Sequence, residues 1–448
     1  MRFFRDINLV FLTYVANYLL AFAVSVLVAR GLGTDGRGVY EIALLTISIA
    51  QAVMSLGVGV ASLYYVNKGT YPLSDLLSNS QFVVLASAAL SGLLVLLAAG
   101  TFGPRLIEED LPYWIFVFGV PLFLNLNLLS TFLQAQSRFL AMNSLLLLRP
   151  VIMLALLATG LAVGGLDTTN VLVFWSLSVL GAVVLGLLLL GVRNLHLPTV
   201  FRPNWPVLRA QIRFGVQGQT GNVLQLLNYR FDKYVVLPFV GWSGVGIYGV
   251  GVGVTESIWF IANAVAVVLL PRLTSARSDE AAQFTPVVCR NTLALSLLAA
   301  VGLGVLSPLL LPLFFGEDFS PSVTAVWWLL PGTVALSGTK ILSSYIFSQG
   351  RPLINTYITI AGLAVTLVFD FALIPFFGVP GAAAASSVAY ASSLALSLAV
   401  YRRLSGRPVS EALFVRWSDV RMYIDAARAV GSRYLSFPQP AGDPEGPP

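Results

Sequence analysis

Long apolar blocks and short polar segments follow one another along this chain. Apolar residues gather in blocks of roughly 20 to 27, each long enough to cross a ~30 Å hydrocarbon core as a helix. Short polar segments separate the blocks, so we predict an all-α polytopic membrane protein. We place twelve spans at residues 7–30, 39–66, 79–100, 112–136, 144–164, 170–192, 213–239, 245–271, 286–311, 323–350, 353–377 and 381–401.

The composition supports this pattern. Of 448 residues, 57% are hydrophobic and 10% charged, whereas an ordinary soluble domain is roughly a quarter charged. The connecting segments leave almost no room for an aqueous catalytic domain, so we do not expect an enzyme. The single cysteine and histidine, Cys289 and His196, make neither an internal disulfide nor a metal site of the usual ligand count. We therefore expect no metal and no cofactor.

Basic residues indicate the orientation. Twelve spans place both termini on one side, and the loops and tails of that side carry twenty basic residues against three on the other. Positive charge accumulates on the cytoplasmic side, so we predict a multi-pass protein of the cytoplasmic (inner) membrane with both termini cytoplasmic. The formal charge of +6 then needs no nucleic-acid partner. Residues 7–29 read as the first span and not as a cleavable signal.

Two short motifs occur twice. The first glycine motif, Gly33–Tyr40, and the second glycine motif, Gly241–Tyr248, share the pattern Gly-x-x-Gly-x-Gly-hydrophobic-Tyr at a constant offset of 208 residues. Gln136-Ser-Arg138 likewise corresponds to Gln349-Gly-Arg351. We interpret the glycines as tight turns between helices and the tyrosines as interfacial anchors. The ordered matches predict an internal duplication.

The duplication defines the expected domains. We expect an N-terminal six-helix lobe at 1–195, a cytoplasmic linker at 196–212 and a C-terminal six-helix lobe at 213–405. Such a parallel repeat places substrate between the lobes near mid-bilayer. Residues 406–436 have the pattern of a basic amphipathic helix, either lying on the anionic cytoplasmic leaflet or packed on the bundle. Residues 437–448, rich in Pro and Gly, are expected to be disordered.

Charges inside the spans are the candidates for function. The stretch Asn228–Lys233 places three charges in an apolar run, where an ionised side chain costs roughly 3 kcal/mol and faces a cavity, a partner or a pathway. Helix rise puts Arg230 and Glu256 at the same depth, about 16 Å below the outer end, so that they could pair. Lys233 and Asp370 both lie about 12 Å below that end, whereas Lys340 lies nearer the cytoplasm.

Two readings of these charges stay open. In the functional one, Arg230 and Lys233 attract an anionic group, aided by Asn228 in the same stretch and by Arg30 at the outer end of the first span. Glu256, Asp370 and Asp232 are then the candidates that titrate or bind a coupling cation. In the structural one, the charges form neutralising pairs that fix helix register. The first half is expected to contain no buried acid.

Several motifs resemble those of a known family. Ala29–Tyr40 resembles the first inter-helix motif of the polysaccharide and O-antigen flippases in the multidrug/oligosaccharidyl-lipid/polysaccharide (MOP) exporter superfamily. Further similar segments follow in the family's order and cover the chain to about residue 405: Asn228–Tyr248, Leu270–Leu273, Leu313–Phe319, Gln349–Arg351 and Ile374–Gly381.

The resemblance implies a two-lobed flippase. Such a protein moves an undecaprenyl-diphosphate-linked oligosaccharide to the outer leaflet by alternating access, driven by a gradient of H⁺ or Na⁺. It implies a cationic cavity, which Arg230 and Lys233 match in kind, and coupling at a carboxylate, for which Glu256 is the first candidate. The implied partners are the lipid-linked oligosaccharide, membrane lipids, a polysaccharide polymerase and glycosyltransferases. The chain lacks the two extra helices usual in peptidoglycan-precursor flippases.

Two alternatives remain. A multidrug and toxin extrusion (MATE) antiporter also has twelve helices in two lobes, but it should offer a carboxylate-rich cavity to organic cations. A non-transporting membrane scaffold for a polysaccharide synthase would have its intramembrane charges fully paired. Removing those charges would then affect folding rather than flux.

Overall fold

The apolar blocks form helices. The computed structural model describes residues 2–102, 112–191, 203–419 and 421, and the regular elements in these ranges are helices. A helix satisfies its backbone hydrogen bonds internally, which a segment in hydrocarbon requires. Within the described ranges, eight helices are long and apolar enough to cross a membrane. The all-α polytopic fold is confirmed, while the number of spans and the duplication stay predictions.

The helices of the first part are α1 (Arg2–Met54), α2 (Val58–Lys68), α3 (Leu73–Phe102), α4 (Trp114–Ala135), α5 (Phe139–Val163) and α6 (Thr168–Leu190). Among them, α3 to α6 follow the predicted spans with shifted ends, whereas α1 continues through the first predicted span into the second, and the expected span 39–66 is divided between Met54 and Val58.

The later helices differ from the prediction around Phe231. The elements are α8 (Trp205–Arg230), α9 (Asp232–Thr255), η3 (Glu256–Ile258), α10 (Trp259–Ser275), α11 (Ser278–Phe315), η4 (Glu317–Phe319), α12 (Ser322–Ser348), α13 (Pro352–Ser405) and α14 (Ser410–Leu413). The expected span 213–239 is divided at Phe231. Moreover, α8 starts within the predicted linker, with Pro206 in its first turn, where proline's missing N–H is not needed. Residues 196–202 of that linker lie outside the described ranges.

Three long helices pass through a single glycine that is not helical. Gly33 in α1 has φ 66° and ψ −170°, and Gly241 in α9 has φ 84° and ψ −174°. Gly378 in α13 has φ 60° and ψ −133°. A positive φ is accessible to glycine without the steric cost that a Cβ imposes. The predicted turns are therefore one-residue breaks, and the two glycine motifs break with the same backbone geometry.

The segment after the last long helix is not one helix. α14 ends at Leu413, and Phe414 is extended, with φ −105° and ψ 125°. The helix expected over 406–436 is therefore interrupted, because polar contacts hold this segment against α11: Arg290 donates to the Glu411 carbonyl and to both Asp419 carboxylate oxygens. The rest of that prediction and the disordered tail at 437–448 fall on residue 420 and residues 422–448, outside the described ranges.

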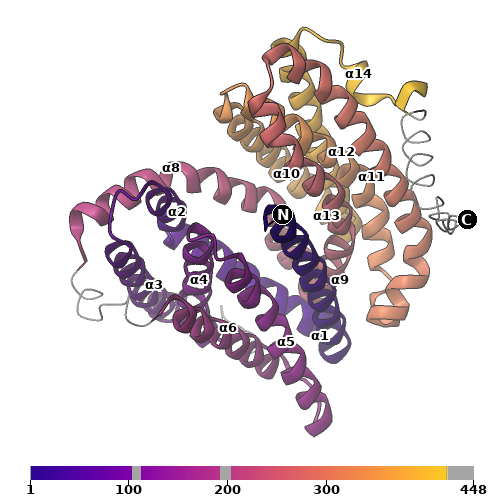
Figure 1. Ribbon diagram of the computed structural model, residues 1–448. Helices are drawn as coiled ribbons and strands as arrows, with labels where there is room; N and C mark the ends of the chain where they lie inside the picture. The colour runs from indigo at the N-terminus through magenta and orange to yellow at the C-terminus, as the bar shows by residue number, and fades with distance from the viewer. Residues whose placement is uncertain (1, 103–111, 192–202, 420, 422–448) are drawn as a thin grey trace, which may run out of the picture. The chain divides into compact units, whose positions relative to one another are not determined.

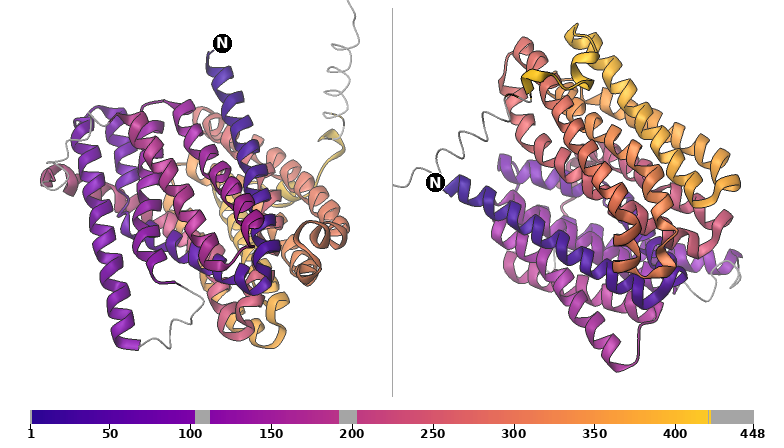
Figure 2. Two further views of the ribbon diagram at one scale, coloured as in Figure 1. Left: turned by 90° about the horizontal axis from the view of Figure 1, so that it is seen from below. Right: turned by 90° about the vertical axis from the view of Figure 1, so that its right-hand side faces the viewer.

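The chain forms two compact units. The first comprises residues 1–257, 301–333 and 356–393. In it α5 packs on α6 and α1, α4 lies against α3 and α6, and α8 lies against α2 (Figures 1 and 2). Fully buried side chains such as Ile47, Leu129 and Phe132 fill the space between the N-terminal helices. A smaller apolar cluster around Ile42, Val236 and Val245 joins α1 to α9.

The second unit comprises residues 258–300, 334–355 and 394–448. Its core gathers Cys289, Leu342, Tyr345 and Tyr401. The Tyr401 hydroxyl donates to the Ala282 carbonyl at 2.9 Å, so the end of α13 is tied to the start of α11.

Candidate functional site

Five charged side chains meet where α1, α8 and α9 come together, all within the first unit. This charged cluster comprises Arg37 and Glu41 from α1, Arg230 from α8, Lys233 from α9 and Glu256 from η3. The cluster contains three bases and two acids, and a third acid, Asp232, lies beside it and acts on Lys233 and Arg230. The three cationic side chains of the cluster are the groups that attract an anion.

The pair that helix rise suggested is present. Arg230 Nη1 lies 2.7 Å from Glu256 Oε1, and Arg230 Nη2 lies 2.8 Å from Glu256 Oε2. This parallel two-bond geometry suits the planar guanidinium and fixes its orientation. The two side chains keep 28% and 20% of their surface exposed, so water and solutes reach this pair.

Lys233 has a partner that the sequence did not suggest. Its Nζ lies 2.6 Å from Oε2 of Glu41, and the other Glu41 oxygen, Oε1, accepts a hydrogen bond from Arg37. Glu41 keeps 17% of its side-chain surface exposed, so the first half contains a partly buried, ion-paired acid that the sequence did not lead us to expect. Glu41 lies at the start of a predicted span, where a charged side chain is expected to face water at the membrane surface. In the structure α9 packs against α1 at this position and covers Glu41 in part. Its position directly after the first glycine motif was the available signal.

Asp232 and Asp370 are both buried. Asp232 Oδ2 accepts from the Tyr248 hydroxyl at 2.5 Å and the Ser386 hydroxyl at 3.1 Å, while Oδ1 accepts from the Lys233 backbone N–H. Both Asp370 oxygens lack a hydrogen-bond partner among the described residues, and the charge of Asp232 acts on Asp370. An ionised carboxylate in such surroundings requires a proton or a cation.

Three other candidates lie apart from the cluster. Asn228 is buried and accepts from the Thr366 hydroxyl of α13 at 3.2 Å. Arg30 donates to two backbone carbonyls at the end of α11, those of Phe314 and Leu313. This arrangement caps a helix C-terminus, where cations are favoured. In the second unit, Lys340 donates to Asn263 Oδ1 at 2.8 Å.

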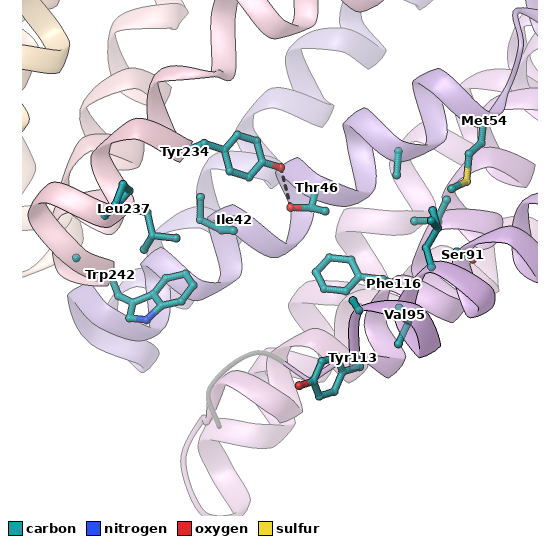
Figure 3. Close-up of a pocket in the computed structure, with 16 residues that line it drawn as sticks. Ile42, Thr46, Met54, Ser91, Val95, Tyr113, Phe116, Tyr234, Leu237 and Trp242 are labelled. Carbon is teal, nitrogen blue, oxygen red and sulfur yellow. Dashed lines mark hydrogen bonds between the residues drawn. The ribbon is translucent and has the colours of Figure 1, made fainter. Parts of the chain in front are cut away.

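An apolar groove lies beside the cluster. Figure 3 shows Ile42 and Thr46 of α1, Tyr234, Leu237 and Trp242 of α9, and side chains of α3 and α4 around a cavity of about 760 Å³. The Tyr234 and Thr46 hydroxyls bond each other at 2.7 Å and so satisfy their own polarity. Ile42 and Tyr234 directly follow Glu41 and Lys233 in sequence. The groove is thus lined for a hydrocarbon chain next to a charged site.

The site offers oxygen ligands but no ready metal centre. Among the described residues, no three His, Cys, Asp or Glu side chains are grouped as a metal site requires. Asp232, Asp370, Ser386 and Tyr248 provide carboxylate and hydroxyl oxygens, the donor type that hard cations such as Na⁺ bind.

Long apolar helices that carry buried, ion-paired charges are typical of membrane transporters. The family described as "Polysaccharide biosynthesis protein" matches residues 3–277, and "Lipid II flippase MurJ" matches residues 257–428. Because the first match covers more than half of the chain, the chain belongs to the polysaccharide biosynthesis protein family. This confirms the resemblance to the polysaccharide flippases of the MOP exporter superfamily.

Individual relatives are distant, and one of them matches along nearly the whole chain. The chain is 23% identical over 433 residues to a "Putative O-antigen transporter" of Shigella flexneri, covering 91% of this chain and 96% of the relative. It is 27% identical over 203 residues to "Probable low-salt glycan biosynthesis flippase Agl15" of Haloferax volcanii, covering 39% of this chain and 41% of the relative.

Solved structures share the fold. "Lipid II flippase MurJ, inward closed conformation" aligns with a TM-score of 0.71 at 12% identity, over 96% of this chain and 94% of that one. An inward-facing MATE family transporter of the MOP superfamily aligns with a TM-score of 0.65 at 13% identity, over 87% of this chain and 95% of that one.

Proposed function

We propose that this protein is a flippase that moves an undecaprenyl-diphosphate-linked oligosaccharide across the cytoplasmic membrane by alternating access. The observation that carries the proposal is the charged cluster, which gathers three cationic side chains, in a chain of the polysaccharide biosynthesis protein family. The O-antigen and glycan flippase relatives support the substrate class.

In this proposal the two chemical parts of the substrate bind to different surfaces. Arg230 and Lys233 bind the diphosphate through charge-assisted hydrogen bonds, for which guanidinium and ammonium groups are suited. The groove beside α9 accepts the prenyl chain, because its lining is apolar and it adjoins the cluster. Asn228 and Arg30 contribute indirectly, by holding α8 and the end of α11 in place.

Ion coupling is proposed at the carboxylates. Asp370, buried without a hydrogen-bond partner in the described structure, binds a proton or Na⁺ together with Asp232. Glu256 is the third candidate, because it must change partner if Arg230 turns to the diphosphate. Occupation of these carboxylates then changes the charge around Lys233, which links the ion gradient to substrate release.

The proposal includes location and partners. Both termini are cytoplasmic and the membrane is the inner one, in agreement with the distribution of basic residues. Glycosyltransferases supply the lipid-linked substrate, and a polysaccharide polymerase uses it on the outer side.

Reconstitution in liposomes tests the function. The purified protein should translocate a fluorescent lipid-linked oligosaccharide and should not transport an organic cation. Arg230→Ala should abolish translocation while the protein still inserts in the membrane. Full activity of that variant would remove Arg230 from the mechanism, and transport of only the organic cation would contradict the flippase assignment.

One observation favours the antiporter alternative. Glu41 is a partly buried acid in the first half, close to the feature whose expected absence argued against a cation transporter. Its two cationic neighbours leave it little capacity for an organic cation, and the cation arm of the liposome assay decides the point.

The pairing of the charges is the observation that favours the non-transporting scaffold. Arg230 and Lys233 both have acidic partners. A scaffold would lose folding in Arg230→Ala, whereas a flippase loses flux and keeps its folded yield.

A further inference from the structure

Glu41 occupies the position where an external anion would bind. Its two carboxylate oxygens contact two different cations, Arg37 through Oε1 and Lys233 through Oε2 at 2.6 Å. The Lys233 side chain is 5% exposed and that of Arg37 7% exposed. Two buried cations thus converge on one carboxylate, and any other anion reaching them must first replace it.

The same place is where the two glycine motifs touch. A Cβ on Gly38 would overlap the carbonyl oxygen of Trp242, and a Cβ on Gly246 would overlap that of Thr34. We call these four residues the glycine junction. Glu41 lies three residues beyond Gly38, and a Cβ on Gly249 would be 3.0 Å from its carboxyl carbon. The Lys233–Glu41 pair therefore joins the two helices whose backbones meet at the junction.

The Arg230–Glu256 pair provides a contrast. It joins residues 26 positions apart that flank α9, whereas Lys233 and Glu41 are 192 positions apart. Separating α1 from α9 leaves the first pair intact and breaks the second. Of these two ion pairs, the Lys233–Glu41 pair is therefore the one that can hold the glycine junction closed, together with the apolar cluster and the Thr46–Tyr234 hydrogen bond between the same helices.

We propose that Glu41 is a displaceable counter-ion. In the absence of substrate its carboxylate pairs with both Lys233 and Arg37 and keeps the glycine junction closed. A diphosphate, which carries more charge and more acceptor oxygens than a carboxylate, replaces Glu41 on both cations. The junction then opens without leaving a buried cation unpaired, so anion binding and opening are linked. This inference rests on the proposed function only for the identity of the natural anion.

A cysteine in the apolar cluster beside the junction reports opening. Val245 is fully buried in that cluster, and the single native cysteine, Cys289, is buried and can be replaced by serine. We expect Val245→Cys, in this background and in detergent, to react slowly with a water-soluble maleimide. Glu41→Gln should speed the reaction several-fold. Asp419→Asn, which breaks a buried pair in the second unit, is the matched control and should leave the rate unchanged.

Farnesyl diphosphate is the probe for displacement. It should speed labelling of Val245→Cys, and it should half-saturate at a several-fold lower concentration in Glu41→Gln, because no carboxylate competes. Farnesol, which lacks the diphosphate, should have no effect. Equal labelling rates with and without the Glu41→Gln substitution, or weaker binding of the probe by Glu41→Gln, would overturn the proposal.

A charge exchange covers the case in which Glu41→Gln does not fold. Glu41→Lys combined with Lys233→Glu restores opposite charges across the junction, so labelling should be slow again. The double variant has a carboxylate in place of Lys233 on α9, so farnesyl diphosphate should no longer speed labelling. Faster labelling with farnesyl diphosphate in this variant would contradict the role of Lys233. The labelling rate of Val245→Cys without ligand tests whether the junction is closed, and it does so even if the protein does not translocate lipid-linked sugars. If the protein translocates them but neither Glu41→Gln nor farnesyl diphosphate changes the labelling rate, the counter-ion role is wrong and the proposed function stands.

Discussion

The two glycine motifs have the same backbone and different chemistry. Gly33 and Gly241 break their helices with nearly equal φ and ψ, and the tyrosines that end the motifs, Tyr40 and Tyr248, are both buried. The charges, however, lie within and directly after the first motif, at Arg37 and Glu41, and on both sides of the second, at Arg230, Lys233 and Glu256. The Lys233–Glu41 pair is the one that joins the two motif segments. If only the second half carried charges, Lys233 would have no acidic partner in the first half.

The largest effect should come from removing the acid that follows the first motif. Glu41→Met leaves Lys233 and Arg37 buried without their common partner, and breaking such a pair costs about 3–5 kcal/mol. Lys233→Met should cost less, because Glu41 keeps Arg37. The melting temperature in detergent, followed by size-exclusion chromatography, measures both. If the double variant is no more stable than Glu41→Met, the two side chains do not interact as described.

The next effect tests the contact between the motifs. Gly38→Ala and Gly246→Ala each place a methyl group into a carbonyl of the other motif, and such overpacking costs about 1–3 kcal/mol. The two losses should be similar in size. Gly253→Ala, on an exposed helical position with open space around it, is the control and should gain about 0.5–1 kcal/mol. Loss in only one of the two junction variants would contradict a reciprocal contact.

A smaller and more selective effect is expected in the groove, which the second motif lines with Gly241 and Trp242. Ala98→Phe fills part of the cavity from α3. It should slow translocation of an oligosaccharide on a C55 prenyl diphosphate several-fold and leave a farnesyl-linked analogue unchanged. Leu93→Phe, at an exposed position of α3 outside the groove, is the matched control. Equal slowing of both lipids would show that the chain does not bind there.

The smallest effect on transport should come from a buried pair of the second unit, which contains neither glycine motif. Hydrogen bonds from the Arg290 guanidinium lower the pKa of Asp419 below its ordinary value of about 4. Because the pKa is lowered, the ionised Asp419 stabilises the docking of residues 406–419 at any pH above its ordinary pKa. This stabilisation is lost as the pH falls through the lowered pKa. Limited proteolysis should therefore cut this segment faster at pH 3 than at pH 6. Asp419→Asn should be cut readily at pH 7 while flipping is unchanged.

The sequence predicted the helices well because spanning segments must be apolar and helical throughout. It also predicted that Arg230 and Glu256 could pair, since they lie equally many residues before Gly241 and after Val245, the expected outer ends of two consecutive spans. The single-residue nature of the breaks at Gly33 and Gly241 was not predictable, because a turn and a kink have the same composition.

Long-range pairing was beyond the sequence. Glu41 meets Lys233 only because α1 and α9 pack together, and no local spacing indicates a partner 192 residues away. Asp370 matched Lys233 in depth, yet depth fixes one coordinate and leaves the rotation of each helix undetermined. The tail was misread for a related reason. Its arginines fit an amphipathic helix, but Glu411 and Asp419 bind Arg290 and turn the chain instead.

The contact between Arg290 and Asp419 also shows that the second unit continues beyond the last long helix. α13 stops at Ser405, yet Ala412 and Asp419 are buried within the second unit. A truncation just after the last long helix would uncover Tyr401 and strand the Arg290 guanidinium in an apolar setting. Tags and fusion partners should therefore be joined beyond residue 421. A boundary drawn from hydrophobicity alone would fall near Ser405 and would remove the buried Ala412 and Asp419.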